Sequence, residues 1–469
     1  MPGAPSSFPY HRSGSALEFP RDEGWHRTLA FDVANPSLRH MEWVYLNAHL
    51  DENGGQGRHF VVFVAYFTQH LRFLVVRGWD AAGASIGTWT GSAWGVLTAS
   101  TESLNVEFRH LGGKDRWAGL ADSTGSPRPF SSKLIARDDA ARFSVELELV
   151  AAKPPYEAGG VGYLPFGQHG AFNYYSVSRL DTQGFLNLTT EGGVESVSVK
   201  GLGWFDHQWG PFFVTPFRLP LLEQYEWMSV QLDSGDDFLL TTVWDPSNQT
   251  PSREAFGGAG WVSPDGTATH LAQQGLWKRT RFWRSPTQGF VYAAGWTFEA
   301  PQWDVQLSIT PRQADQLTPI IDPPLPGVLG ELAAKVFGGA PNFLGEFWEG
   351  SCTVTGTVRG APVKGVAFAE LVKRYEEPRF ELEVARHEPG LSVIGWRVEN
   401  WDPQAPLTYR GYLERAGGVV VKSWPELSLP VLVIDDATLP LGEPLVVRVV
   451  AHTGDGTLSS TRTLSLTLR

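Results

Sequence analysis

HFVVFVAYF, residues 59–67, consists almost entirely of β-branched and aromatic side chains, the types that pack best in β-strands. It follows the turn cluster 53–55, and comparable runs recur as far as residue 375. Glycine, aspartate and proline separate these runs at short intervals, which is typical of a β-sandwich or β-barrel. We predict strands here at residues 59–67, 71–76, 143–150, 172–180, 238–243, 291–298 and 305–310.

The size and composition of the chain indicate several globular domains. Its 469 residues exceed one ordinary core, so two or three domains are expected. The 19 Trp and 27 Phe can fill large β cores or line an apolar ligand pocket, and composition alone does not decide between these roles. The single cysteine, Cys352, excludes an intrachain disulfide and a cysteine-rich metal site.

Charge and hydropathy narrow the class of partner. The net charge is −12 without a basic cluster, which argues against nucleic acid and against anionic membranes. There is no run of about 18 apolar residues, so no integral membrane segment is expected. Residues 1–19 lack the apolar segment of a signal peptide, which favours a cytoplasmic location. The sequence leaves the oligomeric state open.

The pattern of strand and turn signals in the sequence changes near residues 376–378. Seven short strands are predicted after it, at 380–384, 392–398, 407–413, 419–421, 431–434, 445–451 and 461–468. This spacing indicates an immunoglobulin-like or fibronectin-like sandwich without a catalytic constellation. One helix is expected, at residues 327–337. Residues 83–87, GASIG, match the hydrolase G-x-S-x-G pattern, but the residues that follow look extended, which argues against that motif.

The run GWFDHQWG, residues 203–210, is the main candidate for chemistry because it places Asp206, His207 and two indoles between glycines. In an extended segment the even-numbered residues share one face and the odd-numbered residues share the other. The flanking glycines permit a bulge that could bring both sets to one cavity. The alternative is a structural corner in which Asp206 binds backbone N–H groups, His207 is a half-buried polar residue and Trp209 belongs to the core.

Further polar and aromatic residues could take part in acid chemistry on an alkene. A carboxyl group in an apolar pocket has a raised pKa and can donate a proton near neutral pH, and aromatic faces stabilise an adjacent cation. A pericyclic reaction needs only a shaped cavity and one or two hydrogen-bond donors. The candidates in aromatic stretches are Glu42, Tyr45, Tyr175, Glu226, Trp227, Trp244, Asp245 and Glu349.

Four segments resemble a lipocalin-like family that includes carotenoid 1,2-hydratases, AttH-type proteins and fungal Diels–Alderases. They are EWVY (42–45), YYSVSRL (174–180) with Gly184, GWFDHQWG (203–210), and FWEG (347–350) continuing to residues 369–371. Their order and spacing also match, over roughly residues 25–375. The resemblance implies an all-β fold of two consecutive lipocalin-like β-barrel domains. With the sandwich, the expected division is a flexible N-terminus at 1–24, barrels at 25–205 and 206–375, and the β-sandwich at 376–469.

The resemblance also suggests roles for individual residues. A histidine and a tryptophan of the D-H-x-W motif are implicated in the hydratases, which points to His207 and Trp209. The nearest counterparts of a downstream tyrosine and aspartate are Trp244 and Asp245, with tryptophan in place of tyrosine. We therefore expect an enzyme without cofactor or metal that hydrates or cyclises an apolar polyene, terpenoid or polyketide substrate. A Diels–Alderase-like pericyclase and a non-catalytic lipid or pigment carrier are the alternatives.

The expected site combines both groups of candidates. Asp206, His207 and Asp245 are the candidate catalytic residues. The candidate substrate-binding residues are Glu42, Tyr45, Tyr175, Trp209, Glu226, Trp227, Trp244 and Glu349.

Overall fold

The structure is a computed structural model that describes residues 17–26, 38–67, 70–166, 170–214, 224–244, 258–271, 276–287, 289–319, 346–435, 439–440 and 442–468. Within these ranges the chain is almost wholly β, as predicted, and its helices are the single 3-10 turns η1 (Arg21–Glu23), η2 (Ala158–Gly160) and η3 (Pro301–Trp303). Among the described residues no helix is long and apolar enough to span a membrane. The helix expected at 327–337 and the candidate Asp245 lie outside the described residues.

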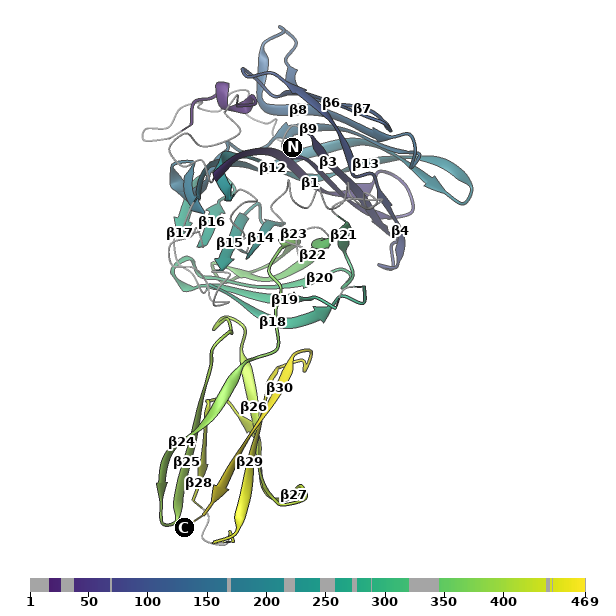
Figure 1. Cartoon of the computed structure of the whole chain (residues 1–469). Coiled ribbons are helices and arrows are strands. Elements are labelled where there is room, and N and C mark those ends of the chain that lie inside the picture. Colours follow the sequence, from purple (N-terminus) through teal and green to yellow (C-terminus); the bar gives the residue numbers. More distant parts are fainter. Residues whose placement is uncertain are drawn as a thin grey trace.

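The first sheet closes into a barrel at the upper end of the molecule (Figure 1). Counted over the described residues it has 13 strands, and pairing of β12 with β9 closes it. Its strands are β1 (Leu38–Glu52), β2 (His59–Phe67), β3 (Leu71–Trp79), β4 (Ser85–Thr90), β5 (Ala93–Ala99), β6 (Asn105–His110), β7 (Gly113–Ala121), β8 (Pro127–Asp138), β9 (Phe143–Ala151), β10 (Tyr156–Glu157), β11 (Tyr163–Phe166), β12 (Gly170–Thr190) and β13 (Gly193–Val214).

The second sheet lies below the first and curves around its own core (Figure 1). In the described ranges it runs from β17 through β14 and β23 to β18. Its strands are β14 (Gln224–Leu232), β15 (Asp237–Trp244), β16 (Gly258–Val262), β17 (Ala268–Leu271), β18 (Trp277–Arg284), β19 (Val291–Ala300), β20 (Val305–Pro311), β21 (Leu317–Pro319), β22 (Glu346–Val358) and β23 (Ala361–Leu371).

The C-terminal strands form a sandwich of two small sheets at the opposite end of the molecule from the first barrel (Figure 1). It follows the second sheet, and the Phe282 backbone N–H donates to the Asp455 carboxylate at 2.6 Å between the two. The strands are β24 (Phe380–Glu388), β25 (Leu391–Val398), β26 (Leu407–Arg415), β27 (Val419–Leu427), β28 (Val431–Ile434), β29 (Pro444–Thr453) and β30 (Ser459–Thr467).

Strand alternation divides the barrel residues between two environments. In β1 the even-numbered Val44, Leu46 and Ala48 point into the core of the first barrel. The odd-numbered Tyr45 belongs to a separate aromatic core that also contains residues of β14, β15 and β23. Because successive side chains of a strand point to opposite faces, β1 contributes both to the barrel interior and to the interface between the two sheets.

Two domain limits differ from those expected. The division at 205/206 falls inside β13, which stays in the first sheet up to Val214, so the change of sheet lies between Val214 and Gln224. Leu17 and Phe19, which the sequence places in a flexible N-terminus, are buried in the core of the first barrel. Their apolar side chains fill its interior, whereas residues 1–16 lie outside the described part of the chain.

Candidate functional site

The run 203–210 lies inside the long strand β13 and forms no turn. It pairs with β1 without interruption, and the nearby bulge is in β12, between Val177 and Leu180. His207 therefore faces the interior of the first barrel with Trp209, while Asp206 faces the interface between the sheets. The alternation predicted from the sequence is present, but the bulge that would bring both faces to one cavity is not. The side chains of Asp206 and His207 therefore lie in different environments.

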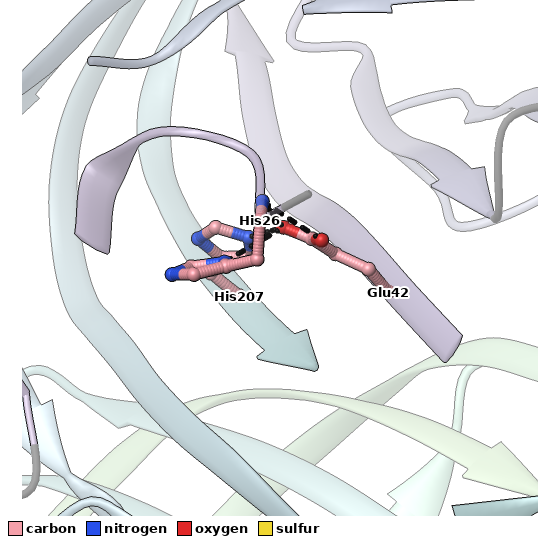
Figure 2. Close-up of side chains that lie close together, drawn as sticks. All are labelled: His26, Glu42 and His207. Atoms are coloured by element: carbon pink, nitrogen blue, oxygen red, sulfur yellow. Dashed lines mark hydrogen bonds and ion pairs between the residues drawn. The ribbon is translucent and has the colours of Figure 1, made fainter. Parts of the chain in front are cut away.

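Inside the first barrel, His207 belongs to a buried group with Glu42 and His26 (Figure 2). His207 Nε2 lies 2.9 Å from Glu42 Oε1, and His26 Nδ1 lies 3.0 Å from the same oxygen. The His26 backbone N–H also donates to both oxygens of Glu42. Glu42 and His207 come from the neighbouring strands β1 and β13, whereas His26 comes from the segment after η1. We call these three residues the His26–Glu42–His207 triad.

The triad combines groups of different charge. Burial lowers the pKa of His207, more than the hydrogen bond to Glu42 raises it, so this imidazole is neutral. Burial also opposes charge on His26, but the carboxylates of Asp22 and Glu42 outweigh it and raise the pKa of His26. For Glu42, burial is outweighed by the hydrogen bonds from His207 and His26, so its pKa is lowered. An ionised carboxylate is thus held between two imidazoles.

Aromatic rings enclose the triad. The Trp209 ring stacks on the His26 ring at 3.8 Å between centroids, and Tyr175 packs edge-on against His207 at 5.6 Å. Phe19, from the N-terminal segment, lies 4.9 Å from Tyr175. The ligand atoms of the three triad residues all lie within 4.8 Å of one another, so the triad has the composition and spacing to hold a metal ion.

On the other face of β13, Asp206 is buried between the two sheets. Its Oδ1 accepts hydrogen bonds from Ser176 at 2.6 Å and from the Trp204 indole at 2.7 Å. Burial raises the pKa of Asp206 to about 7, because it outweighs these hydrogen bonds and that of Tyr174. The Tyr174 hydroxyl itself accepts from the Trp227 indole at 2.9 Å. Asp206 is therefore linked across the interface to β14 of the second sheet.

Two further carboxyl groups lie at the same interface, on the neighbouring strands β22 and β23. Glu349 and Glu370 are directly opposite each other in the pairing of these strands. The Tyr45 hydroxyl donates to Glu349 Oε2 at 3.3 Å, and the Tyr225 hydroxyl donates to Glu370 Oε1. Burial raises the pKa of Glu370 to about 7 and that of Glu349 well above its ordinary value. We call Asp206, Glu349 and Glu370 the interface acids.

The interface acids lie within an aromatic core that is exposed in part. Trp227 packs against Tyr45 at 5.4 Å and against Trp204 at 6.2 Å. Trp227, Tyr45 and Trp204 are buried, whereas Tyr225 and Glu370 are only half-buried. Other half-buried hydrophobic residues pack on the same core, namely Trp43, Phe67, Trp94, Ala268 and Phe347. This arrangement can bring a neutral carboxyl group next to an apolar ligand.

Glu226 and Trp244 belong to a third group, inside the second sheet. Glu226 Oε2 accepts from Arg279 Nε at 2.9 Å and lies 2.8 Å from Arg279 Nη2 in the same ion pair, and its other oxygen accepts from Tyr375 at 3.1 Å. The Arg279 guanidinium also lies 4.7 Å from the centre of the Trp244 ring. Both candidates therefore contact the same buried arginine, Glu226 through an ion pair and Trp244 through a cation–π contact, and both belong to the packing of the second core.

The structure thus divides the predicted site residues into three groups. Glu42, Tyr175, His207 and Trp209 lie in the first barrel. Tyr45, Asp206, Trp227 and Glu349 lie at the interface between the two sheets. Glu226 and Trp244 lie in the second core. The partners that sequence reasoning missed are His26, Tyr225, Arg279 and Glu370. His26 lies beyond any motif and was not detectable by spacing. Glu370, in contrast, is a lone acid in the apolar strand AFAEL at 367–371, a signal that could have identified it.

Comparisons with known proteins extend this description. A model of the AttH-like family matches residues 10–374, and no curated protein matches the chain. An AttH protein from Nitrosomonas europaea is similar in structure, with 20% identity, a TM-score of 0.51, and coverage of 76% of this chain and 98% of that one. Kievitone hydratase from Nectria haematococca is 14% identical, with a TM-score of 0.51, and the match covers 78% of this chain and 98% of that one. CghA with Sch210972 is 10% identical, with a TM-score of 0.41, and the match covers 76% of this chain and 96% of that one. The first two share the fold of the two barrel regions.

Proposed function

This chain belongs to the AttH-like family, and we propose that it is an enzyme that protonates a C=C bond of a bulky apolar substrate at the interface acids. Hydration or ring closure would complete the reaction. The fold is shared with kievitone hydratase, whose name states a hydration, and this supports hydration as the first reaction to test.

The observation that carries the proposal is the set of carboxyl groups inside an aromatic core whose pKa values are raised by burial. Burial brings the pKa of Asp206 and of Glu370 to about 7 and raises that of Glu349 well above its ordinary value. A carboxyl group that keeps its proton near neutral pH can act as a general acid. The indole of Trp227 and the ring of Tyr45 lie beside these acids and would stabilise a cation next to them.

Glu370 is the proposed proton donor because it is the half-buried member of the interface acids. Its proton bonds to one alkene carbon with the π electrons, which leaves a cation on the other carbon. Water then bonds to that cation, and loss of a proton to the Glu370 carboxylate restores the acid. In ring closure, the π electrons of a second double bond of the substrate bond to the cation in place of water, and the new cation then loses a proton from an adjacent carbon to the Glu370 carboxylate. Tyr225 and Glu349, which contact Glu370, would hold its carboxyl group in position.

His207 is not given the proton transfer in this proposal. It faces the first barrel and is bonded to Glu42, whereas the interface acids lie on the opposite face of β13. A joint role for Asp206 and His207, as the sequence suggests, would require both side chains on one face. Their separation allows the two faces to be tested independently.

The proposal is tested by incubating the protein with acyclic polyenes and terpenoids in D2O, and by analysing the products by mass spectrometry. One solvent deuterium should appear in each new C–H bond. Glu370→Gln should reduce turnover by about 100-fold or more, within the range of general acid catalysis. Glu381→Gln, at an exposed position of β24, is the matched control and should retain full activity.

Four results would contradict the proposal. Full activity of Glu370→Gln and of Glu349→Gln would remove the interface acids from the mechanism. Loss of activity in His207→Gln, with both glutamate variants active, would place the chemistry in the first barrel. A product without deuterium would indicate a pericyclic reaction, and a ligand returned unchanged would indicate a carrier.

A further inference from the structure

The His26–Glu42–His207 triad has no part in the proposed reaction, yet it gathers three potential metal ligands from separate segments of the chain. Glu42 comes from β1, His207 from β13, and His26 from the N-terminal segment that lies against the first barrel (Figure 2). Glu42 and His207 are buried, and His26 is only 18% exposed. Two imidazoles and a carboxylate are the ligands that zinc and related ions take in many proteins.

Two distances within the triad match those between neighbouring ligands of one metal ion, and all three ligand atoms lie within 4.8 Å of one another. His207 Nε2 and His26 Nδ1 lie 2.9 and 3.0 Å from Glu42 Oε1. Two ligands that are each about 2.1 Å from a metal, at angles of 90–109°, are about 3.0–3.4 Å apart. A metal ion could therefore take the position between these atoms in place of the protons that now join them, with little movement of the side chains.

Asp22 provides a second, independent indication of a metal site, because it lies next to the ring nitrogens of both imidazoles that would not bind the metal. The other ring nitrogen of His26, Nε2, lies 3.3 Å from Asp22 Oδ1. The Nδ1 of His207 faces the backbone of Asp22, without a hydrogen bond of good geometry. Histidines that bind metals usually donate their second N–H to a carboxylate or a backbone carbonyl, which fixes the ring. Asp22 offers both kinds of acceptor.

We infer that His26 Nδ1, Glu42 Oε1 and His207 Nε2 bind one first-row divalent transition metal ion, with Asp22 as the orienting second layer. Such an ion would fasten residues 17–26 to β1 and β13 of the first barrel. Three protein ligands leave at least one coordination position for water or another small ligand. This inference is independent of the proposed function, because it concerns the opposite face of β13.

The test uses tag-free full-length protein that has been treated with a chelator and then titrated with Zn²⁺ by calorimetry. We expect one equivalent to bind, and Co²⁺ to give the visible absorption of a site with nitrogen and oxygen ligands. His26→Ala and His207→Ala should each abolish this binding. Asp22→Asn should weaken it by about 10- to 100-fold, as for other second-layer residues. His70→Ala, which removes an exposed histidine of the same sheet, is the matched control and should bind normally.

Two further measurements keep the outcome clear. Hydrogen exchange of residues 17–26 should slow when Zn²⁺ is added to the wild-type protein and should not change in His26→Ala. His26 lies outside the strands of the first sheet, so circular dichroism should show that its replacement leaves the fold intact. The inference is wrong if no equivalent binds, or if stoichiometry and affinity are the same in His26→Ala and His207→Ala as in the wild type. Neither result depends on a substrate.

Discussion

Replacement of Asp206 by asparagine should make the protein more stable above about pH 4, by an amount that grows up to about pH 7 and stays constant above it. Asparagine has the same shape, and its side-chain oxygen can still accept from Ser176 and Trp204, as Asp206 Oδ1 does. It cannot ionise. The variant therefore removes the cost of a buried charge and keeps the hydrogen bonds that fix the side chain.

The magnitude follows from linkage between folding and protonation. The pKa of Asp206 is about 7 in the folded protein, against an ordinary value of 3.8. Below about pH 4 the folded and unfolded states both carry the proton. Between about pH 4 and 7 only the folded state keeps it, so the free energy of unfolding falls by about 1.4 kcal/mol for each pH unit. Above about pH 7 the loss is complete, at roughly 4 kcal/mol.

The assay is urea-induced unfolding of the wild type and of Asp206→Asn at pH 5 and pH 8, followed by near-ultraviolet circular dichroism. About two pH units of the loss lie between these conditions. The free energy of unfolding of the variant relative to the wild type should therefore rise by about 3 kcal/mol from pH 5 to pH 8. Asp181→Asn, an exposed position of β12, is the control. A difference that stays constant within about 0.5 kcal/mol would refute the neutral state of Asp206, because it corresponds to less than half a pKa unit.

Three other variants or reagents test the remaining structure. Arg77→Met removes the donor to the carbonyl oxygens of Glu349, Gln316 and Leu317 across the interface. Urea unfolding should show that the free energy of unfolding falls by roughly 3 kcal/mol or more. Arg109→Met, at an exposed position, is the control. Phe19→Ala should speed hydrogen exchange of residues 17–26 by about 100-fold, because it removes a buried ring worth about 3 kcal/mol, and unchanged exchange would contradict the docking of this segment. Cys352 is buried and its thiol pKa is raised by burial, so a thiol reagent should modify it only after denaturation.

The sequence predicts strands well both where a strand is buried along its length and where it is largely exposed. Residues 59–67 coincide with β2, whose burial is continuous along the strand, and the seven runs predicted after residue 378 correspond to β24–β30. The 21-residue strand β12 is predicted only at 172–180, and the 22-residue strand β13 is not among the predicted strands, although residues 203–210 are considered as an extended segment. Polar residues and glycines interrupt their patterns, and extensive pairing with each other and with β1 holds them extended.

The contact partners of a side chain are harder to predict from the sequence than the face of the strand on which it lies. Strand alternation gives the face of His207 and of Asp206, because it depends only on neighbouring residues. The contact of His207 with His26 depends on how an N-terminal segment packs against the barrel, and no local pattern encodes that. Likewise, the ion pair that engages Glu226 requires Arg279 from a distant strand. The resemblance of four segments predicts the family, which the match over residues 10–374 confirms.

The glycines around the D-H-x-W motif serve close packing rather than a turn. A Cβ atom on Gly203 would lie 2.8 Å from Thr182 Oγ1, and one on Gly201 would lie 2.0 Å from the His49 carbonyl oxygen. Glycine therefore lets β13 approach β12 and β1 closely enough to stay paired with both. This pairing keeps the strand extended and without a bulge through Asp206 and His207, so that consecutive side chains enter the interface and the barrel. Two residues that are adjacent in sequence thus belong to two separate sites, and variants at one should be judged against variants at the other.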